Sequence, residues 1–148
     1  MALQLYRRKQ QEIDDADKII SWQTKYVASN LTNVSQDIAE VQFNNLTIGR
    51  TYLLGGSVDV TENNNILTLN FRSAASNLGD LYHQFEINTN TIAQQTFALN
   101  KRFIATSTSM YVYLISIGST ILHGDGTVSG THIQLVEKRN DVETISFN

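Results

Sequence analysis

Three histidines and one aspartate are the side chains with the clearest capacity to bind a metal ion. They are His83, His123 and His132, with Asp125 two residues after the second histidine. Imidazole and carboxylate groups ligate zinc when a fold brings three or four of them together. Their spacing follows no recognised ligand pattern, and the chain has no cysteine. We therefore expect no metal site and interpret the histidines as surface or hydrogen-bonded residues, although one histidine could meet its copies on a threefold axis.

The sequence offers no catalytic arrangement. The Gly-x-Ser-x-Gly turn that presents a serine nucleophile is missing. The glycine-rich run 124–126 would cradle a phosphate only if a helix followed it, and turn and strand residues follow instead. Glycan cleavage needs two acids facing one cleft, and no spacing pairs any two of the candidates, which are Asp59, Asp80, Glu86, Asp125 and Asp141. We predict a non-enzymatic protein without a cofactor, and a glycan-cleaving enzyme is the alternative that stays open.

Composition narrows the range of partners. The chain has 148 residues, which is enough for one domain with an appendage, and a formal net charge of −3. Nucleic-acid binding depends on clustered Lys and Arg, and no basic stripe runs through the body of the chain. No stretch approaches the roughly 20 apolar residues of a membrane-spanning helix. We predict neither a nucleic-acid partner nor a membrane partner.

Charge density falls near Lys25 and divides the chain. Charged side chains crowd the first 20 residues, whereas Asn, Thr, Ser and alternating hydrophobic residues dominate the rest. We predict an N-terminal arm over 1–20, a β-sandwich domain over 21–140 and a C-terminal tail over 141–148. The arm repeats an apolar residue every seven positions, which fits a short helix or an extended segment ordered by a neighbour.

The basic triplet of this arm has two interpretations. It is either a solvated face or a contact with an acidic surface of a larger particle. Under the second interpretation, the anchoring residues are Tyr6, Arg7, Arg8, Lys9 and Ile13.

After the arm, hydrophobic and polar residues alternate, which is the pattern of half-buried β-strands. Gly and Asn residues between the alternating runs tolerate positive φ and suit tight turns. The triplet Asn63-Asn64-Asn65 gives the clearest hairpin signal. Many short strands at regular spacing predict an all-β antiparallel sandwich or barrel. The expected strands are 19–28, 38–43, 51–60, 66–72, 81–87, 91–99, 102–106, 109–117 and 131–138.

The segment 109–117 is apolar on both of its faces. Alternate side chains of a strand point to opposite faces, so one row consists of Met110, Val112 and Leu114. A strand of a solitary antiparallel sandwich buries one row and exposes the other to water. We therefore predict that a second copy of the chain covers the other row, which makes the protein a homo-oligomer. The predicted oligomer interface is Tyr111, Tyr113, Ile115 and Ile117.

The aromatic residues stand mostly at strand positions, where core or interface packing is their usual role. Trp22 stands at the junction between the arm and the β domain, where we expect it to hold the two together. Exposed Tyr, Asn and Asp side chains in the loops give the alternative, a surface that binds a glycan.

Two segments resemble a recurrent passage of bacteriophage virion proteins. The first, from Val41 to Val58, reads VQFNNLTIGRTYLLGGSV. The second, from Gly126 to Lys138, reads GTVSGTHIQLVEK and looks like the last strand of the same domains. Those domains are trimeric heads with a topology similar to tumour necrosis factor or complement C1q. The resemblance implies an antiparallel jelly-roll-like β-sandwich, and we expect Leu46 and Tyr52 in its core and Gly49 in a turn.

The resemblance also implies a function. In that family such heads occur on tail fibres, which recognise hosts, and on capsid decoration proteins, which stud or reinforce the shell. We therefore expect a structural protein of the virion, a homotrimer anchored by its N-terminal arm to capsid or tail proteins. The short arm favours a capsid decoration or short fibre protein. The alternative is a receptor-binding fibre head, or a carbohydrate-binding module that attaches to a host-surface glycan.

Overall fold

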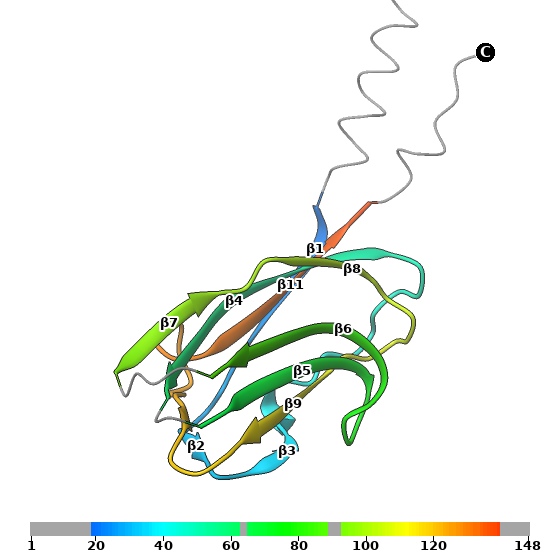
Figure 1. The fold of residues 1–148 in the computed structure, drawn as a ribbon. Helices are drawn as coiled ribbons and strands as arrows, with labels where there is room; N and C mark the ends of the chain where they lie inside the picture. Colours follow the sequence, from blue (N-terminus) through cyan, green and yellow to red (C-terminus); the bar gives the residue numbers. More distant parts are fainter. Residues whose placement is uncertain (1–18, 63–64, 89–92, 140–148) are drawn as a thin grey trace, which may run out of the picture.

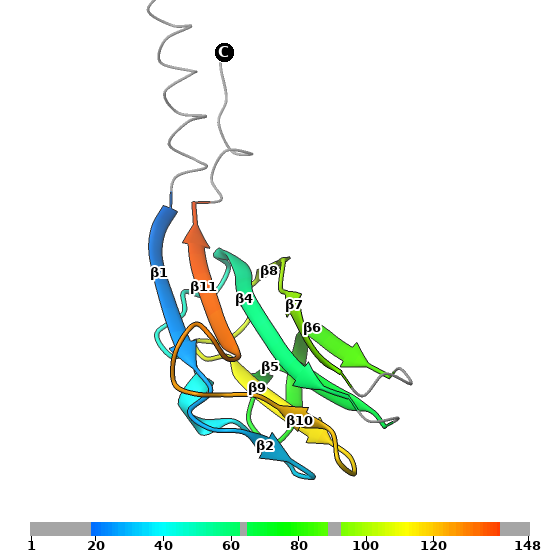
Figure 2. The same ribbon diagram turned by 90° about the vertical axis from the view of Figure 1, so that its left-hand side faces the viewer.

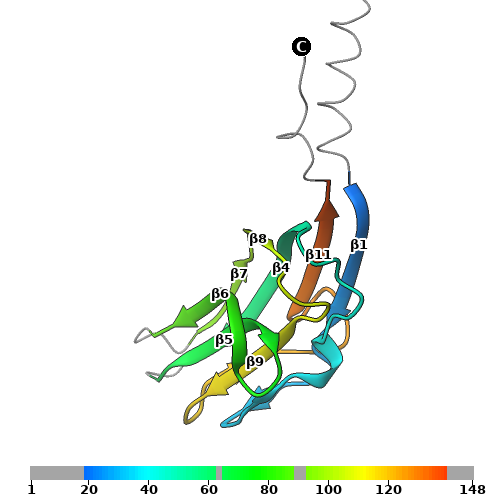
Figure 3. The ribbon, with the colours of Figure 1, turned by 90° about the vertical axis from the view of Figure 1, so that its right-hand side faces the viewer.

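The computed structural model describes residues 19–62, 65–88 and 93–139, which form two antiparallel β-sheets packed against each other (Figures 1 and 3). The expected all-β sandwich is confirmed. Within these ranges no helix is long and apolar enough to cross a membrane. The predicted anchoring residues and the predicted tail over 141–148 lie outside the described residues; the anchoring residues are Tyr6, Arg7, Arg8, Lys9 and Ile13.

The large sheet is built around β4 (Thr51–Thr61), which hydrogen-bonds along both of its edges. One edge pairs first with β11 (His132–Lys138) and then with β10 (Ile121–Leu122). The opposite edge pairs with β8 (Lys101–Ile104) and then with β7 (Gln94–Ala98). β4 therefore holds four strands in place.

Two further strands extend the large sheet on the β11 side. β1 (Ile19–Tyr26) pairs with β11, and β2 (Leu31–Thr32) pairs with β10. Figure 2 shows β1, β11 and β4 side by side, with the start of β1 and the end of β11 at the same end of the sandwich. β1 is thus an outer strand of the large sheet.

The small sheet has the order β3-β9-β5-β6. Its strands are β3 (Ser35–Asp37), β9 (Tyr111–Ser116), β5 (Leu67–Ala74) and β6 (Leu78–Ile87). The core fills the space between the two sheets, and alternate residues of both contribute to it. The expected inner row of β9 is buried, because Met110, Val112 and Leu114 are at most 1% exposed.

The expected hairpin at Asn63-Asn64-Asn65 is wrong. β4 belongs to the large sheet and β5 to the small sheet, so the segment between them crosses from one sheet to the other. Glu62 is 1% exposed in this segment, and its carboxylate accepts a hydrogen bond from the Asn65 amide at 3.0 Å. The hairpin of the small sheet joins β5 to β6 instead, with Ser76 and Asn77 at positive φ. Turn residues mark a change of direction, but they do not specify which strands it joins.

The expected strand over 38–43 is also wrong. The chain forms a single 3₁₀ turn there, η1 (Ala39–Val41). Val41 and Phe43 are fully buried, so the alternation of hydrophobic residues reflects burial of an irregular segment. The segment is tied to β9 and its start by a bridge between Phe43 and Met110 and by a hydrogen bond from the Ile38 amide to the Val112 carbonyl oxygen at 2.9 Å.

The segment before β4 follows the expectation. Leu46 and Tyr52 are 4% and 2% exposed, and both belong to the core. Gly49 adopts a φ of +86°, which favours glycine because a Cβ atom would be strained there. This turn therefore brings the chain segment before β4 next to the phenol ring of Tyr52.

The hydroxyl of Tyr52 joins this segment to the last described strand. It donates a hydrogen bond to Glu137 Oε1 at 2.7 Å and accepts one from the Thr47 amide at 2.8 Å. Burial raises the pKa of Tyr52 above its usual value, so the phenol keeps its proton and remains a donor. Glu137 itself is 9% exposed, which makes the phenol an important partner of its carboxylate.

Tyr52→Phe tests this link. The substitution keeps the ring in the core but leaves the Glu137 carboxylate and the Thr47 amide without the phenol. We expect the free energy of unfolding, measured with urea, to fall by about 1–3 kcal/mol. Tyr26→Phe is the matched control, because the Tyr26 hydroxyl forms no hydrogen bond with a described residue, and its effect should stay within about 0.5 kcal/mol. Equal effects of the two substitutions would contradict the role given to the Tyr52 hydroxyl.

Candidate functional site

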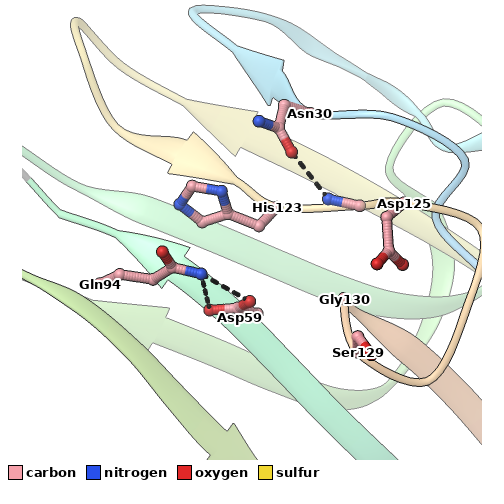
Figure 4. A pocket seen from close by; sticks show the side chains of 8 residues that line it. Asn30, Asp59, Gln94, His123, Asp125, Ser129 and Gly130 are labelled. Carbon is pink, nitrogen blue, oxygen red and sulfur yellow. Dashed lines mark hydrogen bonds between the residues drawn. The ribbon is translucent and has the colours of Figure 1, made fainter.

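A polar pocket of about 200 Å³ opens on the outer face of the large sheet (Figure 4). It lies where the second half of β4 meets β7, β10 and the loops after β1 and β10. We call it the β4 pocket. Its lining residues are Asn30, Asp59, Gln94, His123, Gly124, Asp125, Ser129 and Gly130.

Asp59 forms the floor of the pocket. Its side chain is on the outer face of β4 but only 6% exposed. Both carboxylate oxygens accept hydrogen bonds from the Gln94 side-chain amide, at 2.8 and 3.0 Å. The Asp59 backbone amide donates to the Thr131 hydroxyl at 2.9 Å. These bonds hold the carboxylate in a fixed orientation toward the pocket.

Two further contacts shape the pocket walls. The His123 ring lies 2.6 Å from the Thr61 hydroxyl, measured from Nε2 to Oγ1. The side-chain oxygen of Asn30 accepts a hydrogen bond from the Gly124 amide at 3.0 Å, which joins the loop after β1 to the loop after β10. The side-chain nitrogen of Asn30 and the Nδ1 atom of His123 form no hydrogen bond with any described residue. Both atoms are therefore available to a ligand.

Asp125 belongs to a tight turn at the pocket edge. Its Oδ1 accepts hydrogen bonds from the Thr127 hydroxyl at 2.8 Å and from the Thr127 amide at 2.9 Å. These two bonds lower the pKa of Asp125 below its usual value, so the exposed carboxylate is ionised at neutral pH. Gly126 follows at a φ of +77°. The run 124–126 is thus a turn, as the sequence predicts.

The pocket suits a neutral ligand that carries several hydroxyl groups. Its lining combines carboxylate, amide, imidazole and hydroxyl groups, which provide both donors and acceptors. In the described ranges no group of three or more His, Cys, Asp or Glu is placed to hold a metal ion. The three histidines are dispersed: His123 lines the pocket, His132 lies on β11 near Ser57, and His83 lies on β6 against Phe71.

The predicted interface row lies on the outer face of the small sheet. Tyr111, Tyr113 and Ile115 are half-buried there, and Ile117, just beyond β9, is 48% exposed. The row is therefore accessible in the single chain. Its role in oligomerisation stays a prediction.

Polar groups share this outer face with the row. Tyr113 is paired with Asn70 on one side and with Asp37 on the other. Asp37 Oδ2 accepts a hydrogen bond from the Ser76 amide at 2.8 Å. Asp37 Oδ1 is buried and accepts no hydrogen bond from any described residue. Buried carboxylate oxygens usually have a donor, and among the described residues this is the one buried side-chain oxygen or nitrogen without a hydrogen-bond partner.

No protein-family model matches the sequence, and no characterised protein matches it either. The fold does resemble solved structures. The tumour necrosis factor Eiger from S. frugiperda aligns with a TM-score of 0.53 and 6% sequence identity, over 78% of this chain and 92% of that chain. This likeness shows the fold alone. The chain is a jelly-roll β-sandwich.

Two further structures align with lower scores. One is a chain of the T13 IBDV viral particle, with a TM-score of 0.46 and 11% identity over 80% of this chain and 35% of that chain. The other is a carbohydrate-binding module from Cellvibrio mixtus lichenase 5A in complex with cellotriose, with a TM-score of 0.43 and 15% identity over 84% and 92%. Both are too dissimilar to bear on function.

His83 makes the stability of the fold depend on pH. Burial, with a smaller effect from Lys101, lowers the pKa of His83 below its usual 6.5. The folded protein therefore takes up this proton at lower pH than the unfolded chain does. The contribution of His83 to stability is full above pH 6.5 and falls as the pH drops below that value. We expect the urea concentration at which half of the protein is unfolded to differ between about pH 7.5 and pH 5.5. This difference should be smaller for His83→Gln than for the unchanged protein.

The His83 titration gives an independent reading of the same effect. Its ring resonances in NMR should titrate with a midpoint below 6.5. A midpoint at or above 6.5, or an unchanged pH dependence in His83→Gln, would contradict the assignment.

Proposed function

We propose that this chain is a non-enzymatic structural protein of a bacteriophage virion, a capsid decoration or short fibre protein. In this proposal it assembles as a homotrimer through the outer face of the small sheet, and residues 1–20 anchor it to other virion proteins. The jelly-roll fold supports the proposal. So does the position of the two resembling segments: they include most of β4 and all of β11, which pair directly in the large sheet.

The observation that carries the proposal is the outer face of β9. It presents two tyrosines and an isoleucine in one row, half-buried, beside the unsatisfied Asp37 Oδ1. Aromatic residues are enriched in the cores of protein interfaces. A neighbouring copy that covers the row would bury the apolar rings.

The carboxylates of the β4 pocket favour binding over catalysis. Glycoside hydrolysis requires one carboxylic acid with a raised pKa that donates a proton. Hydrogen bonds lower the pKa of Asp125 instead. Both oxygens of Asp59 accept hydrogen bonds from the amide of Gln94. Asp125 therefore lacks the environment of a general acid, and the Gln94 amide contacts both oxygens of Asp59.

Sedimentation velocity tests the oligomer. We expect a trimer at micromolar concentration, and a shift to monomer for the double substitution Tyr113→Ser and Ile115→Ser, because it removes apolar area from the centre of the interface. Ile48→Ser is the matched control: Ile48 is 63% exposed in the loop before β4, outside the predicted interface. A monomer for the unchanged protein, or a trimer that survives the double substitution, would overturn the proposed interface.

A second candidate function is attachment to a host-surface glycan. The β4 pocket favours it, because four chain segments bring polar groups with both donors and acceptors to one opening. Sugars present many hydroxyl groups, each able to donate and accept. The pocket volume of about 200 Å³ suits one sugar unit more than a large ligand, since ligand pockets commonly span about 300–1,000 Å³.

A glycan array probed with the purified protein tests this candidate. We expect binding to at least one neutral glycan, weakened about tenfold or more by Asp59→Asn, because hydrogen bonds to a charged group contribute about 1.5–3 kcal/mol. Asp80→Asn makes the same charge change on β6, in the other sheet, and should leave binding unchanged. An array without any bound glycan would exclude the second candidate.

A further inference from the structure

Trp22 is exposed on the surface of the large sheet. It is the single tryptophan of the chain, and 67% of its surface is accessible. It lies on β1 and is paired with Val136 of β11, which is paired in turn with Leu53 of β4. Directly paired residues of an antiparallel sheet point to the same face. The indole therefore lies on the outer face of the large sheet, at one end of an apolar row.

A second aromatic ring lies further along the same strand and on the same face. Tyr26 is four residues after Trp22, which corresponds to about 13 Å along a strand. It is paired with His132, and their ring centroids are 6.3 Å apart. His132 is paired with Ser57 of β4, and the two side chains approach to 3.4 Å. Tyr26, His132 and Ser57 therefore form a second row across the outer face, which is aromatic and polar.

The face between the two rings carries polar side chains and, at Gly55, no side chain; we call this stretch, Thr24, Gln134 and Gly55, the Gly55 trough. Thr24 of β1 is paired with Gln134 of β11, which is paired with Gly55 of β4. A Cβ atom at Gly55 would meet only the Gln134 side chain, at an ordinary 3.6 Å. Gly56 differs, because its φ is +97° and a Cβ atom there would lie 2.2 Å from the His132 carbonyl oxygen. The backbone requires glycine at 56 but not at 55.

The outer face of β4 continues from this trough into the β4 pocket. Gly55, Ser57 and Asp59 alternate along β4 and so point to the same face. Ser57 is paired on its other side with Ala98 of β7, another small residue. Small side chains thus leave β4 low between its neighbours, from the trough to the buried carboxylate of Asp59. Figure 2 shows β1, β11 and β4 next to one another along this path.

The charges of this surface stand at its two ends. Arg102 and Lys138 flank the end near Trp22, and Asp59 lies at the pocket end. The middle carries hydroxyl, amide, imidazole and aromatic groups. A neutral chain fits this distribution, since an acidic ligand would meet Asp59 and Asp125 and a basic one would meet Arg102 and Lys138.

We propose that this surface, from Trp22 through the Gly55 trough to Asp59, binds a neutral linear oligosaccharide of several sugar units. This inference rests on the second candidate function and extends it from one pocket to a track. Trp22 and Tyr26 stack on sugar faces, which present C–H groups to aromatic rings. Gln134, His132 and the pocket groups bind the hydroxyls. A covering protein subunit would be expected to meet a continuous apolar centre instead, and polar side chains interrupt this one.

The emission of Trp22 tests the track directly, because the full chain has no other tryptophan. The probes are neutral hexose oligomers of two to eight units, with α- and β-linked glucans, mannans and galactans. We expect one series to change the intensity and wavelength of Trp22 emission in a saturable manner. Within that series, affinity should rise by about tenfold or more from two units to six, because only longer chains reach from the pocket to Trp22.

Two substitutions locate the ligand. Tyr26→Ala removes the second ring, and we expect affinity to fall by about tenfold. Gly55→Val fills the trough with a side chain that β-strands accept readily, and it should weaken long oligomers while it leaves binding of the shortest ones unchanged. Gly55→Ala and Ile48→Ser are the controls, and thermal unfolding of each variant checks that the fold is intact.

The outcomes separate the track from the pocket. If glycans that bind on the array leave Trp22 emission unchanged, or bind equally well at two units and at six, the track is wrong. Glycan binding at the β4 pocket alone is then supported. If Trp22 emission changes with protein concentration alone, a second copy covers this face and the track is wrong. If no glycan binds in either assay, the second candidate function fails and the track fails with it.

Discussion

The hydrogen-bond ladders of β4 are the constraint on which the rest of the structure depends. Each edge of this strand pairs with two strands: β11 and β10 on one, β8 and β7 on the other. Its inward residues, such as Tyr52 and Leu54, form the floor of the core, and its outward residues form the trough and the pocket. The Tyr52 hydroxyl fixes β4 to β11 and to the turn before it. Any shift in the register of β4 would disturb both the core and the binding surface.

The sequence predicted the sheets because a period of two is a local signal. Leu67, Leu69 and Phe71 alternate with polar residues, and all three are fully buried on β5 as expected of one inward row, although Thr68 and Asn70 between them are buried as well. Turn chemistry is also local, which is why Gly49 could be assigned correctly. The path of the chain between sheets is not local. An Asn-rich segment reverses direction equally well within a sheet or between sheets, so the Asn63–Asn65 hairpin was predicted and a crossover was found.

The β4 pocket was invisible to sequence reasoning for the same reason. Asn30, Asp59 and Gln94 come from three separate segments, and His123 and Ser129 share a fourth; no spacing connects these four segments. Single polar residues of these types are common on any surface, and only the fold selects these five. The two-faced strand was different: its pattern lies within nine residues, and its inner and outer rows occur where expected. The sequence therefore indicates surfaces made by one strand and misses those made by several.

The pairing of β1 with β11 joins the first and last strands of the described chain. Such a contact closes a very long loop, and proteins rich in distant pairings fold slowly. During synthesis, β1 emerges early and must wait for β11 before its inner edge finds a partner. Throughout that interval the exposed indole of Trp22 and an open strand edge are available to other chains, which is a route to aggregation. Expression yield, more than equilibrium stability, is the property that this topology places at risk.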